Sequence, residues 1–153
     1  MRGSSQPSLV AAPPVSVTRP RVSATGPYGR DMPTPMPATS WIKSITVDCE
    51  DALPVAAFWA AALGGELEED STSDKAFVEA PGWGGVNLWF QRVAEPKIAK
   101  NRLHLDLRAP GQGPDAVADE VARLEALGAT VQAVHGGLTV MLDPGGNEFC
   151  VEL

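Results

Sequence analysis

Three side chains near the C-terminus have types and a spacing suited to proton transfer. Glu148, Cys150 and Glu152 alternate along a segment typical of a β-strand, so they share one face of it. If that face lines a pocket, the carboxylates of Glu148 and Glu152 could act as a general base on a small carbonyl compound. Burial and mutual repulsion would then raise the pKa of at least one of them. The alternative is a solvated Glu148 at the preceding turn and a frayed Glu152.

A second group lies on the predicted strand Asn101–Arg108, where His104 and Asp106 share a face. Cys150 could be a nucleophile if it contacts His104 as its activating base. The alternative is that Cys150 is a small core thiol and that His104 is hydrogen-bonded to Asp106 or to a neighbouring strand. Cys49, on a predicted core face, is expected to be inert.

Tryptophan rings offer a different chemistry, the stacking of planar ligands. Trp83 lies in a Pro-Gly-Trp-Gly-Gly loop, and Trp89 alternates with apolar residues along a predicted strand. Rings at the mouth of a pocket can stack on an aromatic ligand, and the alternative for both is ordinary packing. Trp59 belongs to the apolar stripe of a predicted helix and is assigned to the core.

Charge is distributed unevenly along the chain. Residues 1–40 contain four Arg and one Asp, a net charge of +3, and the remainder has a net charge of −10. An acidic body excludes nucleic acid as the expected partner, because no basic patch offsets phosphate repulsion. A basic rim follows one predicted strand and could favour an anionic ligand, or it could simply be solvated. It consists of Arg92, Lys97, Lys100 and Arg102.

Composition also bounds the location. No apolar run approaches the ~20 residues that span a membrane, and the N-terminus has no apolar core of a secretory signal. Two cysteines do not make a disulfide framework, so reduced thiols and a cytoplasmic location are expected.

The first 39 residues read as a disordered tail. Residues 1–40 hold eight of the fourteen prolines and only Tyr28 as an aromatic, so they cannot bury enough apolar surface to offset the entropy of ordering. Translation could instead start near Met36, and the functional alternative is a Pro-rich docking tail.

From residue 40 onward the same order of elements occurs twice. Asp51 is expected to cap a helix over Ala52–Leu63, and Asp115 a helix that ends at Gly128. Each helix follows one predicted strand and precedes three others. The predicted strands are Trp41–Cys49, Glu66–Asp70, Ala76–Ala80, Val86–Arg92, Asn101–Arg108, Thr130–Val134, Leu138–Leu142 and Glu148–Leu153. The pattern predicts an α+β domain of two βαβββ modules, about 41–92 and 101–153, with helices outside a curved, mixed sheet.

Four segments in this order resemble the vicinal oxygen chelate (glyoxalase/bleomycin-resistance) superfamily, and most of all its glyoxalase-like domain branch, common in bacteria. The segments are Asp51-Ala52-x4-Ala57-Phe58-Trp59-x3-Leu63-Gly64-Gly65, Asn101-Arg102-Leu103-His104-Leu105-Asp106-Leu107, Glu120-Val121-x-Arg123-Leu124-x2-Leu127-Gly128-Ala129, and Asp143-Pro144-Gly145-Gly146-Asn147-Glu148-Phe149-Cys150. The resemblance covers about residues 41–153. It implies a cup-shaped pocket and often a homodimer.

For metal-dependent relatives, the resemblance implies four ligands, one from the first and one from the last strand of each module. By position they fall at Ser44, within Asn87–Gln91, at His104 and at Cys150, with Glu152 as an alternative on the same face as Cys150. Only His104 is a usual ligand there, because serine is a weak ligand and cysteine suits zinc better than harder ions. No cofactor is therefore expected, and the alternative is divalent Zn, Ni, Mn or Fe at His104, Glu152 and Cys150.

Three functional hypotheses follow. The first is metal-independent binding or sequestration of a small molecule, the second a metal-dependent lyase, isomerase or dioxygenase, and the third a non-catalytic dimeric domain with a structural or regulatory role. The sequence leaves open whether the protein is an enzyme. The residues expected to contact a ligand are Ser44, Trp83, Trp89, Gln91, His104, Asp106 and Cys150.

Overall fold

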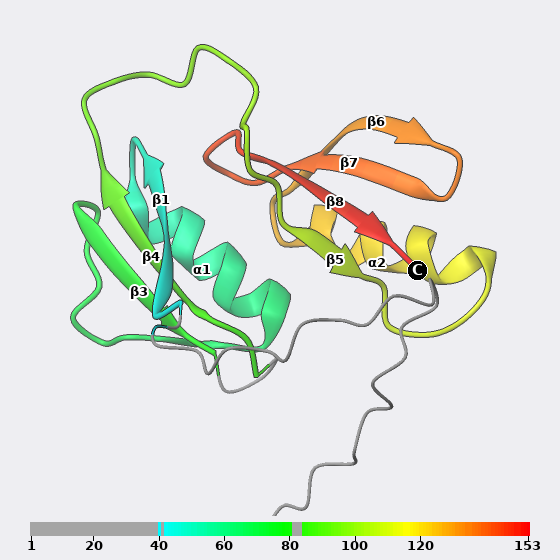
Figure 1. Ribbon diagram of the computed structural model, residues 1–153, viewed down its shortest axis with the longest axis horizontal. Helices are drawn as coiled ribbons and strands as arrows, with labels where there is room; N and C mark the ends of the chain where they lie inside the picture. Colours follow the sequence, from blue (N-terminus) through cyan, green and yellow to red (C-terminus); the bar gives the residue numbers. More distant parts are fainter. Residues whose placement is uncertain (1–39, 41, 81–83) are drawn as a thin grey trace, which may run out of the picture. The chain divides into compact units, whose positions relative to one another are not determined.

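The computed structural model describes residues 40, 42–80 and 84–153 (Figure 1). The predicted tail, Trp41 and Trp83 lie outside these residues. In chain order the strands and helices are β1 (Ser44–Cys49), α1 (Ala52–Leu63), β2 (Glu66–Leu67), β3 (Lys75–Glu79), β4 (Asn87–Arg92), β5 (Asp106–Arg108), α2 (Pro114–Ala126), β6 (Thr130–His135), β7 (Leu138–Leu142) and β8 (Glu148–Glu152).

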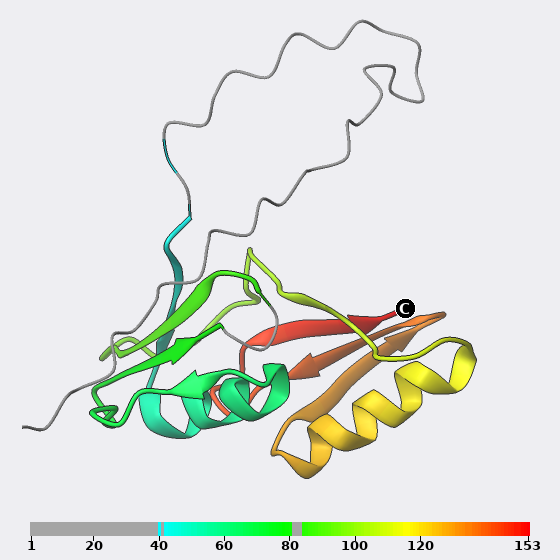
Figure 2. The same ribbon diagram turned by 90° about the horizontal axis from the view of Figure 1, so that it is seen from below.

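The described residues form two modules with the same topology. One sheet has the strand order β1-β4-β3-β2 and the other β5-β8-β7-β6. In each sheet the first and last strands of the module are parallel, and the remaining pairs are antiparallel. Each sheet has its own helix packed on one face (Figure 2). The predicted α+β fold of two βαβββ modules is confirmed, with two separate four-stranded sheets rather than one continuous sheet across the modules.

Local sequence accounts for α1. The carboxylate of Asp51 accepts a hydrogen bond from the backbone N–H of Leu53, as an N-cap residue does. Gly64 ends the helix in the left-handed conformation with φ of 66°, a region that favours glycine. Val55, Ala56 and Trp59 are buried, as the apolar stripe predicts.

Two boundaries in the second module differ from the prediction. Gly113, not Asp115, is the N-cap of α2, because Pro114 occupies the first turn and Asp115 lies one residue further in. Strand β5 begins at Asp106 rather than Asn101. Residues 101–105 thus form part of a linker (93–105) between β4 and β5, and this places His104 outside the strand.

The modules contact each other through α1. Phe58 and Trp59 lie against Phe149 of β8, with ring centroids 5.8 and 5.2 Å away. On α2, the guanidinium of Arg123 donates to the carbonyl oxygens of Ala61 and Ala62, at 3.4 and 2.8 Å. This cation replaces the basic residue that the last turn of α1 lacks.

No helix in the described part of the chain is long and apolar enough to span a membrane.

Candidate functional site

A pocket of about 700 Å³ lies beside β1 and is called the β1 pocket below. Its walls come from β1, from the linker and from the turn between β7 and β8. The lining residues are Ile45, Thr46, Val47, Asp48, Cys49, Glu50, Trp59, Val93, Glu95, Lys97, Asn101, Arg102, Leu103, Leu105, Asp143, Gly145, Asn147 and Glu148.

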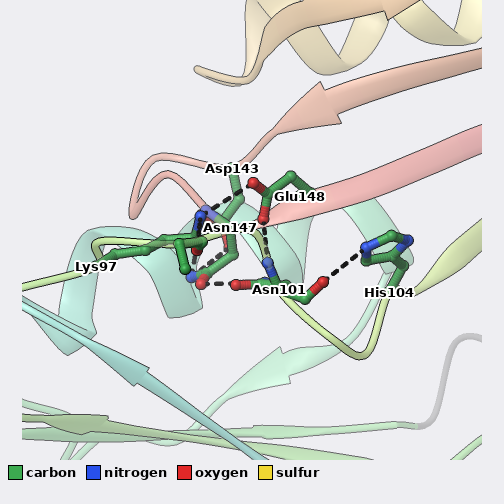
Figure 3. Close-up of polar contacts among 7 residues, drawn as sticks. Lys97, Asn101, His104, Asp143, Asn147 and Glu148 are labelled. Carbon is green, nitrogen blue, oxygen red and sulfur yellow. Dashed lines mark hydrogen bonds and ion pairs between the residues drawn. The ribbon is translucent and has the colours of Figure 1, made fainter.

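Glu148 organises the linker side of this pocket (Figure 3). Its side chain is buried, and Oε1 lies 3.0 Å from Nζ of Lys97, which also donates to the carbonyl oxygen of Ala99. Oε2 accepts the backbone N–H of Asn101 at 3.0 Å. Both carboxylate oxygens therefore hold the linker against the start of β8.

The protonation of Glu148 follows from these contacts. Burial by itself would raise the pKa of this carboxyl group, but the hydrogen bonds from Asn101 and Lys97 outweigh it and hold the pKa below its usual range. The raised pKa that was expected for at least one of the two carboxyl groups is therefore not found at Glu148. Glu148 is an ionised, hydrogen-bonded carboxylate, which is a weak proton acceptor.

Asp143 builds the turn between β7 and β8, which forms another part of the wall. Its Oδ1 accepts the backbone N–H groups of Gly145 and Asn147 at 2.8 and 2.9 Å, and its Oδ2 accepts the indole N–H of Trp59 at 3.0 Å. Asn147 in turn accepts a hydrogen bond from the Asn101 side chain at 3.3 Å. The turn, α1 and the linker are thus joined around two buried carboxylates (Figure 3).

His104 and Cys150 are not brought together as a nucleophile and base. The Nε2 atom of His104 lies 3.0 Å from the carbonyl oxygen of Asn101, a partner different from the predicted Asp106 (Figure 3). Cys150 is buried opposite Asp106 in the β5–β8 pair. Burial, followed by the Asp106 carboxylate, raises the pKa of the Cys150 thiol, so it stays protonated at neutral pH. This environment favours the core-thiol interpretation.

The two predicted catalytic carboxylates lie in different surroundings. Glu148 is buried at the β1 pocket, whereas Glu152 is exposed and lies opposite Arg108 at the far end of β8. Only Glu148 lines the pocket. The shared active surface predicted for the pair is therefore not formed around this cavity.

The predicted ligand-binding residues of the first module that the structure describes do not line the β1 pocket. Ser44 is half-buried opposite Asn87, and Gln91 donates to the carboxylate of Asp48 at 2.9 Å. Trp89 is half-buried, 6.0 Å from the ring of Phe77, and lines a second hollow of about 120 Å³. Of the predicted catalytic, metal-ligating and ligand-contact residues in the described part of the chain, Glu148 alone lines the larger cavity, and Lys97 and Arg102 of the predicted basic rim line it too.

The predicted metal ligands do not fit a metal ion. Among residues 40, 42–80 and 84–153, no three His, Cys, Asp or Glu side chains form a group that could hold one. His104 precedes β5 and points to a carbonyl oxygen, Cys150 is a protonated thiol, and Glu152 is exposed. A divalent ion needs several anionic or imidazole ligands together, so this donor set does not offset its lost hydration.

Sequence reasoning missed the polar residues that shape the pocket. Asp143 and Asn147 belong to the turn segment that carries the family resemblance. That segment could have identified both as residues of the site. Lys97 was assigned to a basic rim, but its partner Glu148 lies 51 residues further along the chain. No local pattern connects positions so far apart.

Comparisons with known proteins agree with the fold. The family model described as "Glyoxalase-like domain" matches residues 44–152. A possible glyoxalase from Bacillus cereus is 18% identical with a TM-score of 0.56, and the match covers 76% of this chain and 100% of that chain. A glyoxalase/bleomycin resistance protein/dioxygenase family enzyme from Burkholderia phytofirmans PsJN is 17% identical with a TM-score of 0.55, covering 71% of this chain and 94% of that chain.

A third similar structure is a mutant of the fosfomycin resistance protein FosX from Listeria monocytogenes, complexed with Mn(II) and dihydroxypropylphosphonic acid. It is 16% identical with a TM-score of 0.54, covering 75% of this chain and 90% of that chain. No curated protein sequence matches. These structures show the fold, and the family model spans most of the chain. This chain therefore belongs to the glyoxalase-like domain family of the vicinal oxygen chelate superfamily.

Proposed function

We propose that this glyoxalase-like domain binds a small organic molecule in the β1 pocket and that it needs no metal to do so. The observation that carries the proposal is the cavity itself, about 700 Å³ in volume. That volume is in the range of roughly 300–1,000 Å³ typical of ligand sites. Ile45, Val47 and Leu105 supply an apolar wall beside a few fixed polar groups.

The polar groups support binding better than catalysis. Both oxygens of Glu148 and Oδ1 and Oδ2 of Asp143 already accept hydrogen bonds from the protein. Carboxylates held in this way fix the shape of the wall, and their oxygens are occupied by donors of the protein itself, so neither group is placed to take a proton from a ligand. Specificity would then come from the shape of the pocket and from Arg102 and the exposed carboxylates at its mouth.

A substitution pair on the linker tests the site directly. Leu103 lines the pocket and is 67% exposed, whereas Ile98 is 91% exposed on the same linker and does not line it. We expect Leu103→Trp to weaken binding of a ligand found by calorimetric screening by about tenfold, or roughly 1.4 kcal/mol, because the ring fills the cavity mouth. Ile98→Trp is the matched control and should bind like the unmodified protein. Equal affinities in the two variants would place the ligand elsewhere.

The metal-dependent alternative is tested on the same samples. The metal content is measured by elemental analysis before and after chelation, and ligand binding is measured by calorimetry on both samples. The comparison shows whether binding depends on Zn, Ni, Mn or Fe. Equal ligand affinity in both samples supports the proposal. Stoichiometric metal whose removal abolishes binding would overturn it in favour of a metal-dependent lyase, isomerase or dioxygenase.

A further inference from the structure

One edge of β1 is free of a neighbouring strand in the described part of the chain. In the order β1-β4-β3-β2, only β4 pairs with β1. The carbonyl oxygen of Cys49 accepts a hydrogen bond from Val93, directly after β4. Because the backbone groups of alternate residues in a strand point to opposite sides, those of Thr46 and Asp48 point away from β4. An open strand edge of this kind is a template for another extended segment.

This open edge borders the β1 pocket. All residues from Ile45 to Glu50 line the cavity, although their side chains alternate between the two faces of the sheet. A cavity over one face would contact every second residue, so the pocket meets the edge of the strand. Leu105, which also lines the pocket, accepts a hydrogen bond from the backbone N–H of Cys150 in β8.

The side chains along the edge differ between the two faces. Ile45 and Val47 pack against the core on one face, and Asp48 is exposed on the other. Two further exposed carboxylates, Glu50 and Glu95, line the same pocket, and no ion pair joins either of them to a described residue. The 113 residues after Ser40 carry a net charge of −10. Two cations line the pocket as well, but Lys97 is paired with Glu148, so the three exposed carboxylates outnumber Arg102. A segment beside β1 would thus meet apolar side chains and a negative charge on balance.

We infer that the β1 pocket takes a short extended peptide whose side chains alternate between basic and apolar, added to the open edge of β1. This inference rests on the proposed function, because it names the class of ligand that the pocket binds. At roughly 3.3 Å per residue, the six residues of β1 can pair with up to about six residues of such a peptide, so a five-residue probe fits along the strand. Backbone hydrogen bonds supply affinity, and the alternating side chains supply specificity.

The probe is the blocked peptide acetyl-Lys-Val-Lys-Val-Lys-amide, with acetyl-Glu-Val-Glu-Val-Glu-amide as the charge-reversed comparison. Calorimetry on the full chain should show binding of the lysine peptide at least about tenfold tighter than that of the glutamate peptide. Absence of binding of the lysine peptide would overturn the inference. If a small molecule from the screen still binds and is weakened by Leu103→Trp, the peptide inference alone has failed. Absence of binding by any ligand removes the proposed function as well.

Two variants at Thr46 isolate the backbone contribution. Thr46→Pro removes the N–H at the open edge, where proline is tolerated because no ladder bond is lost. Thr46→Ala also loses the side chain but keeps that N–H. We expect the alanine variant to bind the lysine peptide at least about tenfold tighter than the proline variant. Equal affinities in two folded variants would overturn the inference.

N-methylated peptides test the same bonds if Thr46→Pro fails to fold. One probe is methylated on both valine nitrogens and the other on the central lysine nitrogen. Since alternate N–H groups of an added strand face β1, one probe should lose binding to the unmodified protein and the other should keep it. Retention by both would overturn the inference. A second outcome would also overturn the inference. If sedimentation shows a dimer that Thr46→Pro converts to a monomer, and the lysine peptide does not bind, a second copy of the chain occupies the open edge.

Discussion

The indole Nε1 of Trp59 donates a hydrogen bond to Oδ2 of Asp143 across 3.0 Å, and both groups are buried. The first residue belongs to α1 and the second to the turn before β8, 84 residues further along the chain. This bond, together with the two backbone N–H groups held by Oδ1, fixes the second module's turn on the first module's helix. The turn and helix together form one wall of the β1 pocket.

Loss of this hydrogen bond is expected to destabilise the domain. Trp59→Phe keeps an aromatic ring beside Phe149 but leaves the buried carboxylate with one donor fewer, at a cost of about 1–3 kcal/mol. Urea unfolding of Trp59→Phe, Asp143→Asn and the double variant measures the coupling between the two side chains. We expect a coupling energy of about 1 kcal/mol or more. Additive single effects would show that the bond contributes nothing of its own.

A side chain at Gly145 is expected to destabilise the domain. A Cβ atom there would lie 3.0 Å from Cγ2 of Val55 and 3.2 Å from Oδ1 of Asp143, closer than ordinary packing allows. We predict that Gly145→Ala lowers the free energy of unfolding by about 1–3 kcal/mol, because the α1 contact must shift. Gly137→Ala is the matched control, since nothing lies within 4 Å of a Cβ atom at that turn. Similar urea midpoints for the two variants would contradict this account of the contact.

The contacts of the Glu148 carboxylate with Lys97 and Asn101 predict a pH dependence of stability. Because the folded-state pKa of Glu148 is lowered, its contribution is present above the unfolded-state pKa, near the ordinary value of 4.5, and is lost as the pH falls through the folded-state pKa. The difference in unfolding free energy between the unmodified protein and Glu148→Gln should therefore be largest near neutral pH and shrink in acid. Lys97→Met should show a smaller pH-dependent difference of the same sign, because this substitution removes one of the contacts that lower the pKa of Glu148. A difference that is constant with pH would show that these contacts do not lower the pKa of Glu148.

Both thiols are expected to be unreactive in the folded protein. Burial, with the nearby carboxylate of Asp143 as the next cause, raises the pKa of Cys49 to about 11, and the pKa of Cys150 is raised mainly by burial. Since the thiolate is the reactive species, a disulfide reagent near pH 8 should label neither cysteine in the native state and both in urea. Rapid labelling of Cys150 in the native protein would revive its candidacy as a nucleophile.

The sequence alone determined the duplicated order of elements and the bounds of α1. Those features follow from hydrogen bonds and side-chain periodicity within a few residues, such as the Asp51 cap and the left-handed Gly64. The alternation of Ile45 and Val47 likewise identified the core face of β1. The resemblance of four short segments was sufficient for the family.

Only the tertiary structure decided which side chains meet. Glu148 was expected at a turn in solvent or on an active face, and it is instead buried against Lys97 from a linker 51 residues away. His104 was expected on a strand, but the sheet begins two residues later because β8 pairs only from Asp106 onward. Pairings of this kind depend on how two modules pack, and packing free energy is spread over many weak contacts that no local pattern in the sequence encodes.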